Sequence, residues 1–146
     1  MAEFKYQSQI DALVALGAPI PPLREPSNLR AYRYIFANDE RCLNHIPPFV
    51  VSPTRAIVKD IRKVPPVEGF ALSCYLDGNK AIDIYFGFIN ERPMLHKSLG
   101  DTLCSGNIAN DDGKVTNPNA DTHFELFEFV GCNLNNTFTK IERVLV

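Results

Sequence analysis

The sequence contains no tryptophan, no paired cysteine motif and no long hydrophobic run. Without a C-x-x-C pair, neither a zinc ribbon nor a thioredoxin-like site is expected, and the three histidines show no metal-ligand spacing. No apolar stretch approaches the roughly 20 residues that span a bilayer. The N-terminus also lacks the basic and apolar regions of a signal peptide. These absences predict a soluble, cytoplasmic protein with free thiols, no metal and no membrane partner.

Basic residues are too sparse to predict a strong nucleic-acid surface. The net charge is −2, divided into +3 over residues 1–66 and −5 over residues 67–146. The densest basic segment, residues 59–63, is interpreted as a solvent-exposed face or loop. We therefore expect no nucleic-acid partner, whereas the uneven charge offers complementary patches for a protein partner.

The length of 146 residues, with ten Phe and five Tyr, suits a single domain with one buried core. Nine of the eleven prolines lie in residues 19–66. This density excludes long regular elements there and predicts an extended scaffold with short strands and bends. The domain 1–146 is thus expected to combine this Pro-rich scaffold with a sheet-rich half over residues 67–146.

Two segments have helical patterns. Residues 4–16 carry an apolar stripe of helical period, followed by Gly17, which suits the position after a helix end. Residues 78–90 are apolar almost all round, and Asp77 is a plausible N-cap. We expect an N-terminal helix and one central helix that packs on more than one side.

The strand predictions lead to the fold class. Residues 28–36 favour a strand, with a short helix capped by Ser27 as the alternative, and residues 54–63 are ambiguous. Further strands are expected at residues 48–51, 69–75, 101–109, 122–130 and 138–145. The predicted class is α+β, with a mixed or antiparallel sheet of about five strands.

The segment from Leu99 to Val130 gathers more chemically useful side chains than any other. Residues 110–113 (Asn-Asp-Asp-Gly) predict a turn and not an EF-hand, because Ile108 would occupy the first ligand position. His123 could act as a general base, and Cys104 could be its nucleophilic partner. The alternative for His123 is a structural, hydrogen-bonded side chain at a strand end.

An arginine, a serine and a glutamate stand, in this order, in three of the predicted strands. Arg33 lies in 28–36, Ser73 lies in 69–75 just before a helix, and Glu125 lies in 122–130. This order is similar to that of the arginine–serine–glutamate ADP-ribosyltransferases. The resemblance implies that Arg33 holds the NAD phosphates, Ser73 positions Glu125, and Glu125 stabilises the ribose cation.

The resemblance covers three short segments. Ser73 does not stand in a Ser-Thr-Ser run, and the nearest second glutamate, Glu128, is three residues from Glu125 and does not form an E-x-E motif. On a strand, residues three apart face opposite sides, so Glu125 and Glu128 are not expected to share one pocket.

Three functions follow from these patterns. The first expectation is a non-catalytic protein-interaction module without a cofactor, because no catalytic motif is complete. The alternative is an enzyme acting on NAD or a related nucleotide through Arg33, Ser73 and Glu125. The second alternative is a Cys104–His123 nucleophilic enzyme. A single nucleotide site would require Arg33, Ser73 and Glu125 to lie within roughly 15 Å of one another.

Overall fold

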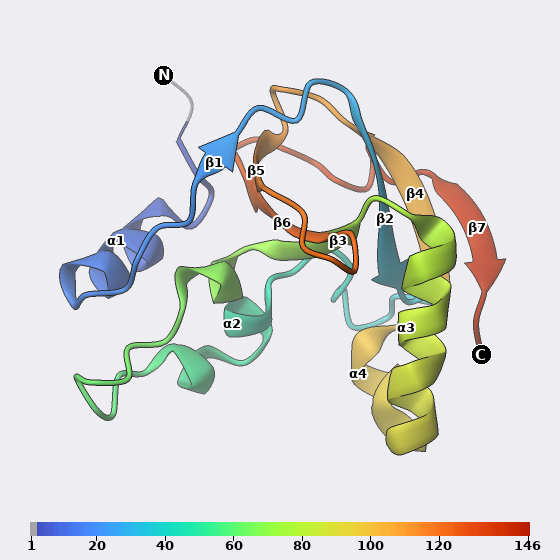
Figure 1. The fold of residues 1–146 in the computed structure, drawn as a ribbon, viewed down its shortest axis with the longest axis horizontal. Coiled ribbons are helices and arrows are strands. Elements are labelled where there is room, and N and C mark those ends of the chain that lie inside the picture. The colour runs from blue at the N-terminus through green and yellow to red at the C-terminus, as the bar shows by residue number, and fades with distance from the viewer. Residues whose placement is uncertain (1–2) are drawn as a thin grey trace.

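A seven-stranded sheet with antiparallel pairing forms the centre of the computed structural model, which describes residues 3–146 (Figure 1). The strand order is β1-β5-β6-β3-β2-β4-β7. The strands are β1 (Leu23–Arg24), β2 (Leu29–Ile35), β3 (Leu72–Tyr75), β4 (Thr102–Ile108), β5 (Gly113–Thr116), β6 (His123–Glu128) and β7 (Lys140–Val144). Strands β6, β3 and β2, which are far apart in the sequence, therefore lie side by side.

The residues before and between the strands also form helices. The α-helices are α1 (Gln7–Ala15), α2 (Pro48–Val51), α3 (Gly78–Glu91) and α4 (His96–Leu99). Three 3-10 helices, η1 (Pro53–Ala56), η2 (Val67–Phe70) and η3 (Pro93–Leu95), complete the set. Within residues 3–146, none of the helices has both the length and the hydrophobicity needed to cross a membrane.

The two faces of the sheet are covered differently. On one face, α3 packs against aromatic side chains of β2 and β3, and α1 and η2 pack around Phe127 at the other end. On the opposite face, Leu134 and Phe138 from the connection between β6 and β7 cover Ala31 and Phe124. The first face thus carries two separate apolar clusters, and a polar strip of β3 and β6 lies between them.

Gly106 permits the connection between β6 and β7 to pass close over β4. A Cβ atom at this position would lie 2.0 Å from the carbonyl oxygen of Thr137, which is closer than atoms can approach. The residue opposite Gly106 on β2 is Ala31, which is fully buried. Small residues on neighbouring strands therefore leave the room that this connection needs.

The α+β class and both main helices are confirmed. The predicted helix 4–16 is observed as α1, and the predicted helix 78–90 is observed as α3, where the Asp77 side chain accepts hydrogen bonds from the backbone of Asn79 and Lys80. The expected strand count of about five is wrong, because the sheet has seven strands. The two unpredicted strands, β1 and β5, span only two and four residues.

The strand predicted at residues 48–51 is also wrong. These residues form α2, in which Pro48 occupies the first turn and Phe49 is buried. Proline is favoured at this position because its fixed φ angle suits a helix and the missing N–H has no partner there. The helix considered for residues 28–36 does not form, because Ser27 and Asn28 have φ angles of 55° and 61° and turn the chain into β2.

Candidate functional site

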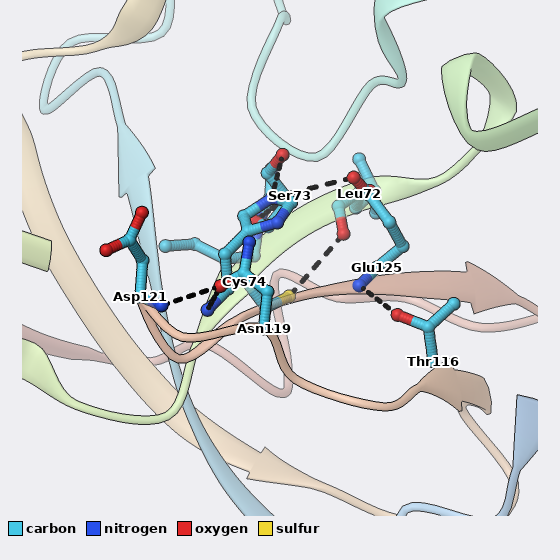
Figure 2. Close-up of polar contacts among 9 residues, drawn as sticks. Leu72, Ser73, Cys74, Thr116, Asn119, Asp121 and Glu125 are labelled. Carbon is cyan, nitrogen blue, oxygen red and sulfur yellow. Dashed lines mark hydrogen bonds and ion pairs between the residues drawn. The ribbon is translucent and has the colours of Figure 1, made fainter. Parts of the chain in front are cut away.

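Three central strands bring most of the predicted site residues together. In the pairing of β3 with β6, Ser73 stands directly opposite Glu125, and Tyr75 stands opposite His123. Since side chains two apart on a strand share a face, His123 and Glu125 point to the same side as Ser73. Figure 2 shows Ser73 and Glu125 on these strands, with Asn119 and Asp121 in the turn that leads into β6.

One nitrogen of His123 joins the serine and the glutamate. Its Nε2 lies 2.9 Å from Ser73 Oγ and 3.5 Å from Glu125 Oε1. The imidazole ring also makes an edge contact with the ring of Tyr75, with centroids 5.3 Å apart. Ser73, His123 and Glu125 therefore form one connected polar cluster.

The backbone around this cluster is fixed by side chains of the segment before β6. Asn119 Oδ1 accepts hydrogen bonds from the backbone nitrogens of Asp121 and His123 (Figure 2). Thr116 Oγ1 accepts from the backbone nitrogen of Glu125 at 2.9 Å. The polar segment that the sequence analysis singled out thus shapes the entry to β6.

Burial sets the protonation of both titratable groups in the cluster. It raises the pKa of Glu125 to about 7, against the opposing effect of the Arg33 charge, and nearby Glu68 raises it further. Burial also lowers the pKa of His123, so this ring is neutral at pH 7. A carboxyl group that titrates near neutrality beside a neutral imidazole is suited to acid–base or charge-stabilising chemistry.

Arg33 contacts the backbone of the cluster from β2, while its guanidinium packs on Phe138. Strands β2 and β3 pair at Tyr32 and Tyr75, and Arg33 Nη1 donates to the Ser73 carbonyl oxygen next to this pair. Its Nε donates to Nδ1 of His45 at 3.0 Å. The side chain is only 8% exposed, and within residues 3–146 no carboxylate lies at ion-pair distance from it.

Two neighbouring cavities open beside these residues. The first, about 350 Å³, is lined by both Arg33 and Arg55 and by no acidic side chain. The second, about 340 Å³, is lined by Ser73 and His123. Tyr34 and Leu99 line both cavities, so a cationic cavity adjoins the serine–histidine cavity. Glu125 lines neither and contacts His123, with 18% of its side chain accessible.

Cys104 is not part of this cluster. It lies on β4 opposite Arg33, is fully buried, and its Sγ donates to the Arg33 carbonyl oxygen at 3.4 Å. Burial raises the pKa of this thiol to about 11, so the thiolate that a nucleophile requires is disfavoured. Neither Cys104 nor His123 has the other as a hydrogen-bond partner in the described part of the chain.

Residues 107–121 contribute structural contacts. Asp112 accepts hydrogen bonds from the Ala109 backbone and the Thr137 hydroxyl, which ties the turn after β4 to the connection between β6 and β7. In the described residues 3–146, no three His, Cys, Asp or Glu side chains are grouped to hold a metal ion. Glu128 lies outside the cluster and forms an ion pair with Lys5 at 2.8 Å.

The sequence analysis did not single out His45 or find Arg55 as part of a site. His45 follows a loop whose return to β2 depends on contacts of Asn44, which exchanges hydrogen bonds with the backbone of Phe36. Arg55 lines the same cavity as Arg33. No local periodicity or spacing marks either residue, because both are positioned by loops.

Comparisons of the chain with protein-family models, with curated proteins and with solved structures found no match.

Proposed function

We propose that this protein is an enzyme that acts on NAD or a related nucleotide and cleaves the bond between ribose and base. Arg33 binds the phosphates, Ser73 and His123 position Glu125, and Glu125 stabilises the cation that develops on the ribose. The observation that carries this proposal is the buried Arg33 guanidinium, which has no acidic partner at ion-pair distance in residues 3–146 and donates to the backbone carbonyl of Ser73, a member of the Ser73–His123–Glu125 cluster.

Arg33 supports an anionic ligand on energetic grounds. A buried charge costs several kcal/mol unless it is paired, and the two acceptors that Arg33 contacts, His45 Nδ1 and the Ser73 carbonyl, are both neutral. The cavity that Arg33 lines also contains Arg55 and no acidic side chain. A phosphate or pyrophosphate group would supply the missing negative charge and accept the remaining guanidinium donor.

The Ser73–His123–Glu125 geometry supports a carboxylate-centred reaction and not a serine nucleophile. In a serine triad, the serine and the acid contact different nitrogens of the histidine. Here Ser73 and Glu125 both contact Nε2. Nδ1 of His123 has no hydrogen-bond partner among the described residues. The arrangement therefore holds the carboxylate in place beside the serine, as the resemblance to the ADP-ribosyltransferases implies.

The reaction balances without a further reagent. The C–N bond between ribose and nicotinamide breaks, and its electron pair leaves with the nicotinamide, which becomes neutral. The ionised Glu125 carboxylate stabilises the positive charge left on the ribose. A hydroxyl of water or of an acceptor then attacks this carbon, and its proton passes to a neutral base, for which His123 is suited by its lowered pKa.

Nicotinamide release from NAD, followed by chromatography, tests this proposal. We expect release by the unaltered protein and a loss of about 100-fold or more in Glu125→Gln and Arg33→Gln. Glu142→Gln and Arg30→Gln are matched controls, because this ion pair lies on β7 and β2 outside the cluster. Absence of release by the unaltered protein, or equal rates in Glu125→Gln and Glu142→Gln, would refute the proposal.

A further inference from the structure

His45 lies at the end of a loop that is held firmly against β2. Asp39 accepts hydrogen bonds from the backbone nitrogens of Leu43 and Asn44, and the Asn44 side chain bonds the backbone of Phe36. The chain then turns at His45, which has a φ angle of 61° and is 8% exposed. Positive φ angles are uncommon for residues other than glycine, although histidine is among the residues that tolerate them best, and the ring at this turn is buried.

In the part of the chain that the structure describes, the buried ring makes one hydrogen bond, to Arg33. His45 Nδ1 accepts a hydrogen bond from Arg33 Nε at 3.0 Å, so Nδ1 carries no proton and the ring must be neutral with its hydrogen on Nε2. Burial and the Arg33 charge lower the pKa of His45 to about 3, which keeps this form at neutral pH. A charged His45 would instead repel the guanidinium.

Phe138 supports both partners of this hydrogen bond. Its ring stacks on the His45 ring at 5.3 Å and 25°, and the Arg33 guanidinium carbon lies 6.0 Å from the same ring. Phe138 comes from the connection between β6 and β7 and is itself buried. The His45 imidazole and the Arg33 guanidinium therefore both pack on the Phe138 ring, which limits their rotation.

The guanidinium is fixed on two of its three nitrogens. Nε is bound by His45 and Nη1 by the Ser73 carbonyl. Nη2 has no protein acceptor among the described residues, and Arg33 lines the cavity that also contains Arg55. We propose that His45 is a positioning residue that orients Arg33 so that its Nη2 edge is available to an anionic ligand. The inference rests on the proposed function, which makes that ligand the phosphate of a nucleotide.

Two substitutions separate the hydrogen bond from the packing. His45→Phe keeps an aromatic ring on Phe138 but has no acceptor for Arg33. His45→Asn restores an acceptor close to the Nδ1 position, and asparagine also tolerates a positive φ angle. The probe is inorganic pyrophosphate, titrated by calorimetry, with the Arg33 Nε–H signal followed by nuclear magnetic resonance.

We expect the unaltered protein to bind pyrophosphate and to show a slowly exchanging Arg33 Nε–H signal. His45→Phe should lose this signal and bind pyrophosphate at least 10-fold more weakly, and His45→Asn should recover to within about 3-fold. Equal binding by the unaltered protein and a folded His45→Phe would overturn the inference, and so would no binding by the unaltered protein.

A measurement on the unaltered chain covers the case in which the variants do not fold. Imidazole nitrogen shifts report the protonation of His45, and we expect a neutral ring with the proton on Nε2. A proton on Nδ1 would overturn the inference. Pyrophosphate binding that depends on His45 in a protein that releases no nicotinamide would refute only the proposed function. Unimpaired nicotinamide release by His45→Phe would refute only the role of His45.

Discussion

Arg33 and Glu125 both stand where an ionised side chain costs folding free energy. Arg33 is 8% exposed, and its guanidinium has no acidic partner at ion-pair distance in residues 3–146. The carboxyl group is buried enough to raise its pKa to about 7. Binding sites commonly retain such unfavourable groups, because the ligand or the transition state, and not the fold, supplies their counter-charge.

The effect of Glu125→Gln on the unfolding free energy should depend on pH. Because the folded pKa of about 7 lies above the unfolded value of 4.5, the folded state retains a proton that the unfolded state loses between these values. Stability contributed by this group is therefore present at low pH and lost as pH rises through 7. We expect Glu125→Gln to raise the unfolding free energy by about 2–3 kcal/mol at pH 8 and by almost nothing at pH 4. Urea denaturation at both pH values measures this, and a pH-independent difference would contradict it.

The rate of nicotinamide release should follow the same ionisation. Only the carboxylate form of Glu125 can stabilise a ribose cation, and its pKa is about 7. We expect the rate to rise about tenfold per pH unit below pH 7 and to level off above it. A flat profile between pH 5 and pH 9 would exclude Glu125 as the group that must ionise.

The candidate residues could be found from the sequence more readily than their arrangement. Arg33, Ser73 and Glu125 were identified by the order of their strands, and His123 was assigned to a different hypothesis with Cys104. The structure instead connects His123 to Ser73, 50 residues away. This contact follows from the pairing of β3 with β6, which is non-local and has no sequence signal of its own.

At the scale of elements, the sequence predicted a helix correctly where an N-cap residue or a helical apolar period marks it. Asp77 and the apolar residues after it specified α3 almost to its observed bounds. The strand predicted at residues 48–51 was wrong. Val50 and Val51 favour a strand, but Pro47 and Pro48 begin a helical turn. The two-residue strand β1 exists only through its pairing with β5, so no local pattern could predict it.

Two glycines should respond oppositely to the same substitution. Gly106→Ala places a Cβ atom against the Thr137 carbonyl, so we expect a loss of about 2 kcal/mol or more. Gly87→Ala lies within α3, and apart from the neighbouring helix backbone no atom of the described residues lies within 4 Å of the new Cβ, so a gain of about 0.5–1 kcal/mol is expected. Thermal unfolding of the two variants provides the comparison. Equal effects would indicate that the connection between β6 and β7 does not pack closely on β4.

At the scale of the whole molecule, the two differently charged halves of the sequence interleave. Strands β1 and β2 come from residues 1–66; β2 lies between β3 and β4, and β1 pairs with β5, all three of them from residues 67–146. Arg33 from the basic half thus donates a hydrogen bond to the Ser73 carbonyl oxygen from the acidic half. The difference in charge between the two halves of the sequence therefore does not by itself place one charged patch at each end of the sheet. The protein-interaction role stays a prediction.

The N-terminal segment is joined to the sheet by a partly buried ion pair. Lys5 Nζ lies 2.8 Å from a carboxylate oxygen of Glu128, which is 3% exposed, and the other carboxylate oxygen has no hydrogen-bond partner in residues 3–146. Lys5→Met should therefore destabilise the fold by about 2 kcal/mol at pH 8, and by less at pH 5, where Glu128 can take up a proton.

Lys97→Met, at an exposed position, serves as the matched control for Lys5→Met and should change stability little. Chemical denaturation at the two pH values distinguishes the variants. If both lysine variants were equally stable at pH 8, the Lys5–Glu128 pair would not anchor the N-terminal segment.

The central claim is that Arg33 and the Ser73–His123–Glu125 cluster form one nucleotide site. Calorimetric titration of NAD into Glu125→Gln, and into the double variant Arg33→Gln/Glu125→Gln, tests this most directly because neither variant should turn over the ligand. We predict stoichiometric binding to the single variant and at least 10-fold weaker binding to the double variant. No binding to either protein, or equal affinities for both, would contradict the account.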